Sequence, residues 1–224
     1  MLVKLGNWLF HFRNILFPLF YAALFIPSPD FFQKEETALI IGAFIVGTGI
    51  AVRCTTIGLV YIIRGGAKRQ IHAEELVTGG IYQVCRNPMY LGNILLIIGF
   101  GIFANSLLFT LIFSPLFVFF YIAIISAEEN FLSGKFDQQF ADYKASTNAI
   151  IPKLENLGAA FEGQTFKWGK VINKEHNSLF LYFSAILLLL LYHGHLGISL
   201  FFICEAVLVL LYALAKYLKH INFI

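Results

Sequence analysis

The sequence predicts an all-α fold, a polytopic membrane helix bundle of about six transmembrane helices with an amphipathic helix on the cytoplasmic side. Of the 224 residues, 58% are hydrophobic and only 13% are charged, whereas soluble domains carry about 25% charged residues. Apolar runs also recur at the length that crosses a bilayer, about 20 residues. The predicted spans are 8–27, 37–55, 89–105, 107–127, 178–193 and 196–215.

The first span contains His11 and Arg13, so a cleaved signal peptide is the competing interpretation. No A-x-A cleavage pattern follows the span, and the sequence Pro27-Ser28-Pro29 is typical of an exit turn. We therefore expect a transmembrane helix here.

Three parts are expected along the chain. Residues 1–36 form an N-terminal span and loop, and residues 37–153 form a core of spans 2 to 4 plus the amphipathic helix. Residues 154–224 form a linker and a C-terminal transmembrane hairpin, because a polar stretch separates the last two apolar runs from the others.

Basic residues predict the orientation, since short cytoplasmic loops carry an excess of Lys and Arg. With an even number of spans, the basic residues in the loops and near the ends of the spans fall on one side of the membrane, and Lys34 alone falls on the other. Both termini and the loops at 56–88 and 128–177 are therefore expected in the cytoplasm. The basic residues on this side are Lys4, Arg13, Arg64, Lys68, Arg69, Arg86, Lys135, Lys144, Lys153, Lys167, Lys170, Lys174, Lys216 and Lys219.

Several functional classes lack their sequence signals. The net charge is only +3, without the clustered basic and aromatic residues that nucleic-acid binding requires, so no nucleic-acid partner is expected. The three cysteines form no C-x-x-C pattern, and His193 and His195 are read as loop residues, so no metal site is expected.

Two charged residues in apolar runs have alternative interpretations. Arg53 either ends the second span at the interface or lies buried within a longer helix, which would indicate function. Glu205, inside the sixth span, either lines a cavity or is protonated and hydrogen-bonded to a neighbouring helix.

The stretch RNPMYLG predicts the start of the third span. Pro88 suits the first helical position, and Asn87 suits the capping position before it. The free N–H groups of a helix start favour an anionic ligand group, and Arg86 adds a positive charge. Gly92 and Gly99 share a face that a helix or a cofactor can approach closely.

Helical spacing separates the two acids that follow the fourth span. Glu128 is four residues from Ile124 and from Leu132, so it is expected to face the bundle, whereas Glu129 is rotated by about 100°. Beyond them, apolar residues at helical spacing alternate with charges. This pattern predicts an amphipathic helix at the membrane interface, acting as an anchor or as a cover for a pocket.

Taken together, these motifs resemble those of the isoprenylcysteine carboxyl methyltransferases and the related phospholipid methyltransferases. The residues that carry the resemblance are LVTGGIY at 76–82, RNPMYLG at 86–92 and EENFLSGKFDQQFADY at 128–143, followed by Ile151-Pro152. Their order and distances match the family pattern over residues 40 to 153.

The resemblance implies S-adenosylmethionine as methyl donor and a lipid-like or prenylated acceptor that enters from the bilayer. It also implies substrate contacts at Arg53 and Arg86. Arg86 would orient the acceptor or the cofactor carboxylate, and Glu128 or Glu129 would accept a proton from an amine acceptor. The implied cofactor contacts are Glu75, Leu76, Val77, Tyr82, Asn87, Pro88, Met89, Tyr90 and Glu128.

The chain departs from the family pattern at four positions. Asn87 stands where the family has histidine, Asp137 where it has glycine, and Phe140 where it has tyrosine. Ile124 stands where the isoprenylcysteine enzymes have a substrate-contacting arginine, so a prenylcysteine carboxylate would lose a partner.

Two other functions are weighed against methyl transfer. The first is an NADPH-dependent membrane reductase of the sterol-reductase type, for which basic residues around the pocket are sparse. The second is a non-catalytic membrane carrier or assembly factor, although repeated halves and interrupted helices, which are common in transporters, are not evident.

Overall fold

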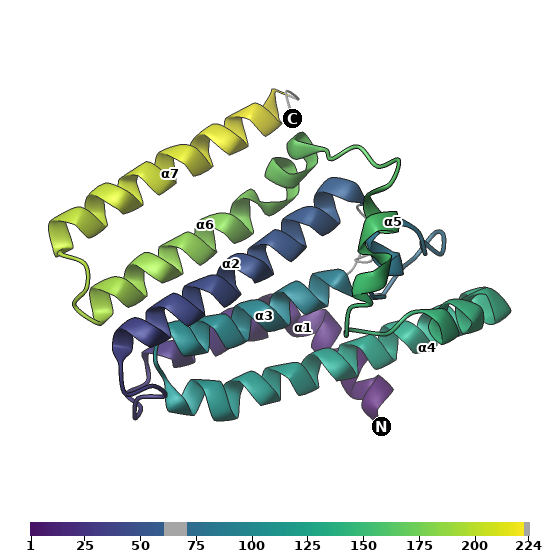
Figure 1. Ribbon diagram of the computed structural model, residues 1–224, viewed down its shortest axis with the longest axis horizontal. Helices are drawn as coiled ribbons and strands as arrows, with labels where there is room; N and C mark the ends of the chain where they lie inside the picture. The colour runs from purple at the N-terminus through teal and green to yellow at the C-terminus, as the bar shows by residue number, and fades with distance from the viewer. Residues whose placement is uncertain (61–70, 222–224) are drawn as a thin grey trace. The chain divides into compact units, whose positions relative to one another are not determined.

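The computed structural model describes residues 1–60 and 71–221 and confirms the all-helical fold class (Figure 1). The basic residues Arg64, Lys68 and Arg69, on which the predicted orientation partly depends, lie outside the described residues. The elements are α1 (Leu2–Ala22), η1 (Ala23–Phe25), α2 (Glu35–Leu59), η3 (Gly80–Gln83), α3 (Pro88–Phe103), the π-helix η4 (Phe109–Phe113), α4 (Ser114–Ser146), η5 (Leu154–Asn156), α5 (Leu157–Phe161), α6 (Trp168–Tyr192) and α7 (Ile198–His220).

Each of the six predicted spans corresponds to one of these helices. Within the described residues, five helical stretches are long and apolar enough to cross a membrane, and α3 is a shorter apolar helix of 16 residues. Apolar side chains on the helix surfaces, such as Phe44, which is 75% exposed, suit contact with lipid. The protein is an integral membrane protein.

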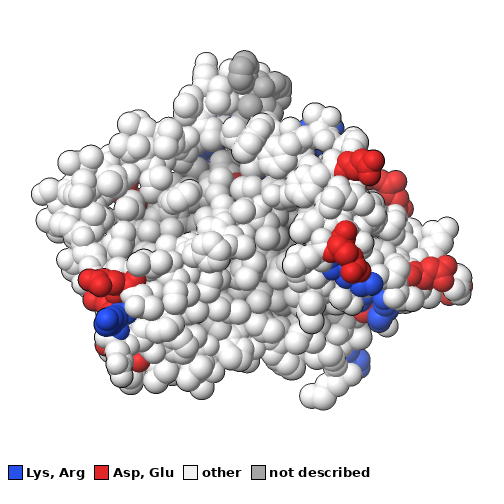
Figure 2. Space-filling model, in the orientation of Figure 1, with Lys and Arg blue, Asp and Glu red and all other residues white. Residues whose placement is uncertain are grey.

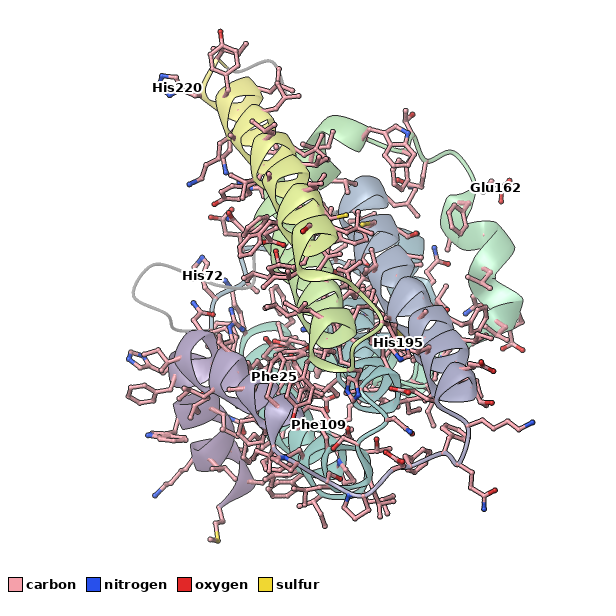
Figure 3. The ribbon with its side chains drawn as sticks, turned by 90° about the vertical axis from the view of Figure 1, so that its left-hand side faces the viewer. Phe25, His72, Phe109, Glu162, His195 and His220 are labelled. Atoms are coloured by element: carbon pink, nitrogen blue, oxygen red, sulfur yellow. The ribbon has the colours of Figure 1, made fainter. Side chains whose placement is uncertain are left out.

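The chain divides into two compact units, Met1–Gln164 and Thr165–Ile224. In the first unit, α1 to α4 alternate in direction (Figure 1). The start of α1, the end of α2, the start of α3 and the later part of α4 therefore share one end of this unit. At the opposite end, Phe25 and Phe109 lie near each other (Figure 3).

Glycines allow close helix packing in the first unit. A Cβ on Gly49 would lie 2.9 Å from the carbonyl oxygen of Gly92, so α2 and α3 approach backbone to backbone there. A Cβ on Gly99 would lie 2.8 Å from Val46, which extends the close contact. The shared face of Gly92 and Gly99 is thus occupied by a helix. On the other side of the unit, Gly6 of α1 packs directly on the Ala123 carbonyl of α4.

The helix α4 continues 33 residues, from the apolar span into the predicted amphipathic segment. The predicted amphipathic helix is therefore the outer part of α4, continuous with the fourth span. A kink at Asp137, whose φ is 41° and ψ is −115°, divides the two parts. In the outer part, Phe140 and Tyr143 are buried.

The second unit is a helical hairpin of α6 and α7. Ser184 of α6 donates a hydrogen bond of 2.7 Å to Oε1 of Glu205 in α7. The interpretation of Glu205 as hydrogen-bonded to a neighbouring helix is thereby confirmed. Tyr212 of α7 donates to Oδ1 of Asn177 in α6 at 2.9 Å, so a second side-chain contact joins the two helices.

Charged side chains gather towards the ends of the helices, and the band between them is largely uncharged on the face drawn in Figure 2. Hydrocarbon strongly disfavours charge, so this distribution is the one expected of helices that cross a bilayer. Acidic and basic side chains are mixed at both ends.

Candidate active site

Tyr90 and Glu128 meet between α3 and α4. The Tyr90 hydroxyl donates a hydrogen bond of 2.5 Å to Oε1 of Glu128. Glu128 is only 1% exposed, which confirms that this acid faces the bundle. Tyr90 lies in the first turn of α3 because Pro88 starts that helix, and the spacing of α4 directs Glu128 towards it. A buried carboxylate beside an aromatic ring results.

Aromatic residues support Tyr90 from the membrane side. The ring of Tyr121 lies 5.0 Å from the ring of Tyr90, and its own ring contacts Phe117 at 5.1 Å and Phe17 at 5.2 Å. Tyr121 is on the same face of α4 as Glu128, seven residues earlier. The site therefore continues into an aromatic seam formed by α1, α3 and α4.

Arg86 and Glu129 form a second pair near the first. Nη2 of Arg86 lies 2.5 Å from Oε1 of Glu129, and Nζ of Lys144 lies 2.7 Å from Oε2. The Arg86 side chain is 7% exposed and that of Glu129 is 16% exposed. Glu129 thus lies on a different side of α4 from Glu128, and the loop before α3 folds over that side.

Arg86 also binds the end of α4. Its Nη1 donates to the carbonyl oxygens of Lys144 and Thr147, the former at 3.2 Å. Carbonyls at a helix end lack helical partners, and a guanidinium satisfies them while complementing the helix dipole. The observed partners of Arg86 thus tie α4 to the start of α3.

Residues 147–156 hold the loop that precedes α3. The N–H of Arg86 donates to Asn148 at 2.9 Å, the N–H of Lys153 donates to Val84 at 2.8 Å, and Asn156 donates to the Gln83 carbonyl at 2.9 Å. These bonds close a buried polar layer around the loop. Burial raises the pKa of the Cys85 thiol in this loop to about 11.

The start of α3 differs in detail from the prediction. Asn87 occupies the position before the helix and Pro88 its first turn, as predicted. The Asn87 side chain does not cap the helix, however. Its Nδ2 donates to the Ala149 carbonyl at 3.1 Å, and the same carbonyl also accepts the backbone N–H of Asn87. Asn87 and Pro88 are buried, and Met89 is half-buried.

Arg53 lies within α2, which ends at Leu59, and it is 8% exposed. The buried interpretation of this residue is therefore confirmed. Its guanidinium donates to Oδ1 of Asn93 on α3. A Cβ on Gly92 would lie 2.6 Å from Cγ of Arg53, so the glycine makes room for the arginine stem. Arg53 and Asn93 form a polar contact one helix away from Glu128.

The predicted contacts before Tyr82 lie on a separate loop. Glu75 is exposed, whereas Leu76 and Val77 are half-buried. The hydrogen bonds between the described site residues do not include these three. The same loop is anchored at Ala73, whose carbonyl accepts from Lys135. Tyr82 is buried in η3, and its carbonyl accepts a 2.7 Å hydrogen bond from Tyr143.

Three site residues were missed by sequence reasoning. Asn93 is a polar residue inside an apolar run, a pattern that indicates a buried partner. Tyr121 precedes Glu128 by seven residues, which places both on one face of a helix. Lys144 carried no local signal, because its contact with Glu129 depends on how the outer part of α4 and the loop fold together.

The Tyr90 and Glu128 pair suits a cationic group. A buried carboxylate attracts positive charge strongly, and aromatic ring faces stabilise ammonium or sulfonium centres by about 1–2 kcal/mol when desolvated. The two nearby arginines already bind Glu129 and Asn93. The residues present therefore fit the positively charged sulfonium of the implied donor.

The chain is similar to known proteins over part of its length. Residues 37–139 match the family model described as phospholipid methyltransferase. The chain is 40% identical over 81 residues to the cobalt-zinc-cadmium resistance protein CzcN of Cupriavidus metallidurans, covering 36% of this chain and 37% of that protein. It is 32% identical over 122 residues to the nickel-cobalt-cadmium resistance protein NccN of Alcaligenes xylosoxydans xylosoxydans, covering 54% and 55%.

The matched regions span about a third to a half of the length of these two relatives. No solved structure gives a significant match to this chain. The family model covers α2, α3 and most of α4, the helices that carry Arg53, Tyr90 and Glu128. Residues 37–139 of this chain therefore form a domain of the phospholipid methyltransferase family.

Proposed function

We propose that this protein is an integral membrane methyltransferase that uses S-adenosylmethionine and acts on a lipid-like acceptor at the cytoplasmic face. The single observation that carries the proposal is the contact between Tyr90 and the fully buried Glu128 carboxylate at the polar end of the helices. The family match over residues 37–139 supports the reaction class. The basic residues near this end favour the cytoplasmic orientation.

The bound donor supplies a methyl group on a positively charged sulfur. Glu128 and the ring face of Tyr90 hold that positive centre, and the hydroxyl of Tyr90 keeps the carboxylate in place. Alignment of two reactants and exclusion of water contribute about 7–11 kcal/mol in favourable cases. The aromatic seam below Tyr90 keeps water from the membrane side of the site.

The other predicted residues take supporting roles in this proposal. Arg86 and Glu129 position the loop before α3, since their observed partners belong to the protein itself. Glu128 is then the carboxylate that accepts a proton from an amine acceptor. Arg53 orients the acceptor from the α2 side. The donor is contacted by the loop at Glu75–Val77 and by residues 82 and 87–90.

Isothermal titration of the purified full-length protein with S-adenosylmethionine tests the donor site. Glu128→Gln keeps the shape of the side chain but removes its charge, so we expect the affinity to fall at least tenfold. Glu162→Gln, at an exposed acid, is the matched control. Unchanged affinity of Glu128→Gln, together with normal binding by the control, would show that the donor site is elsewhere.

The acceptor is identified by transfer of a labelled methyl group. The protein is incubated with labelled S-adenosylmethionine and total membrane lipid, and the extract is separated by headgroup class. Label in a lipid fraction supports the proposal. Binding of NADPH with no binding of S-adenosylmethionine would favour the reductase alternative, and binding of neither would favour a non-catalytic carrier.

The relatives favour a second, physiological candidate function. Because CzcN and NccN are named as metal resistance proteins, we propose that this chain also contributes to resistance to divalent transition metals. Growth of a deletion strain in cobalt, zinc, cadmium or nickel is compared after complementation with wild type or Glu128→Gln. Rescue by wild type alone would link resistance to the methyltransferase site. Equal rescue by both would separate the two functions.

A further inference from the structure

Residues 151–161 turn an apolar face outward. Ile151 is 73% exposed and Leu154 is 67% exposed, and Leu157 and Phe161 are exposed as well. Leu154 and Leu157 are three residues apart where the 3₁₀-helix η5 leads into α5, and Leu157 and Phe161 are four residues apart on α5. These spacings place the side chains on one face.

The opposite face of this segment is fixed to the loop before α3. Asn156 donates to the Gln83 carbonyl at 2.9 Å, and Ala160 is fully buried. A Cβ on Gly80 would lie 4.0 Å from the Ala160 carbonyl oxygen, so α5 packs against η3. The outward direction of the apolar face therefore follows from a contact of the folded protein and not from the spacing alone.

The segment lies at the level of the apolar ends of α2 and α3. A Cβ on Gly80 would also lie 2.7 Å from Cγ2 of Val60, the residue that follows α2. In the sequence, three more apolar residues follow Val60 before the next charge, Arg64. Because Arg53 lies against Gly92 on an antiparallel helix, Pro88 is level with Ile57, also within the apolar run.

We propose that Ile151, Leu154, Leu157 and Phe161 insert into the boundary between the headgroups and acyl chains of the bilayer, as an interfacial lipid contact. An amphipathic segment lies in this boundary with its apolar face buried and its charged residues in water. Lys153, Glu155 and Glu162 give no excess of positive charge, so the contact is hydrophobic and needs no anionic lipid. It does not depend on the proposed methyl transfer.

Depth-dependent fluorescence quenching tests the contact in the full-length protein. Trp8 and Trp168 are replaced by Phe, and a single tryptophan is introduced as Leu157→Trp or, more conservatively, Phe161→Trp. The protein is reconstituted in vesicles of phosphatidylcholine and phosphatidylglycerol, with or without phosphatidylcholine brominated high on its acyl chains. Glu155→Trp, on the charged side of the same segment, is the matched control.

We expect brominated lipid to quench Leu157→Trp and Phe161→Trp at least twice as strongly as Glu155→Trp, and aqueous acrylamide to show the reverse order. Strong quenching of all three by acrylamide, with weak quenching by brominated lipid, would overturn the proposal because the face would be in water. Protection of the two face positions from both quenchers would also overturn it, because protein, either the α6–α7 hairpin or a second copy, would then cover the face.

Discussion

Replacing Asp137 by glycine should stabilise this protein. Asp137 has a φ of 41° and a ψ of −115° within α4, values that side chains with a Cβ rarely adopt. Strain of this kind costs about 1–3 kcal/mol, and glycine avoids it. Glycine in turn loses about 0.5–1 kcal/mol through the greater freedom of the unfolded chain. The Asp137 carboxylate is exposed and makes no side-chain hydrogen bond or ion pair with the described residues.

The expected net gain of Asp137→Gly is therefore between about 0 and 2.5 kcal/mol, with a middle value of about 1 kcal/mol. In a chain of this size, 1 kcal/mol raises the midpoint of thermal unfolding by about 2–4 °C. Thermal unfolding in detergent, followed by circular dichroism, measures the shift. Gln139→Gly, at an exposed helical position in the same part of α4, should instead lower stability by about 0.5–1 kcal/mol. Equal destabilisation by both substitutions would refute the left-handed geometry at Asp137.

Three further predictions concern the packing of buried residues. Gly92→Ala should lower stability by about 1–3 kcal/mol through overpacking. Gly47→Ala, whose Cβ meets open space, should be neutral or stabilising. A similar loss of stability in both variants would contradict the close α2–α3 contact. Glu129→Gln should lower the free energy of unfolding by about 1–3 kcal/mol, because a buried guanidinium loses its carboxylate. Lys144→Met should lower it by less than about 1 kcal/mol, because that lysine is half-exposed. Cys85 should resist labelling by a maleimide at pH about 8, because the thiol is buried, its pKa is raised and only the thiolate reacts. The measurement uses a variant in which the other two cysteines are replaced by alanine. Labelling of this variant before it is unfolded in dodecyl sulfate would contradict the expectation.

The structure explains why the family pattern has glycine at the position of Asp137. The family pattern has glycine after Phe136, and the sequence alone recorded only that this chain has aspartate there. The observed φ gives the physical reason for the family's glycine, since a residue without a Cβ adopts this conformation without a clash. The kink itself was not predicted, because the hydrophobic pattern of α4 continues on both sides of it.

Several features of the site were predictable because they depend on local periodicity. The spacing of Ile124, Glu128 and Leu132 placed Glu128 on the inward face, and Pro88 marked the start of α3. The role of Asn87 as a side-chain cap was predicted wrongly. Its competing partner, the Ala149 carbonyl, is more than 60 residues away in the sequence, and no local rule reveals that contact.

The sequence by itself determined the membrane-spanning fold, the positions of the six apolar helices and the inward direction of Glu128, because hydrophobicity and the 3.6-residue helical repeat are local properties. Only the tertiary structure decided that Tyr90 bonds Glu128, that Arg86 binds Glu129 and the end of α4, and that Arg53 reaches Asn93. These contacts join residues that are about 40 to 60 positions apart. Their formation depends on the close glycine-mediated packing of helices and on the fold of the connecting loops, which no periodic pattern encodes.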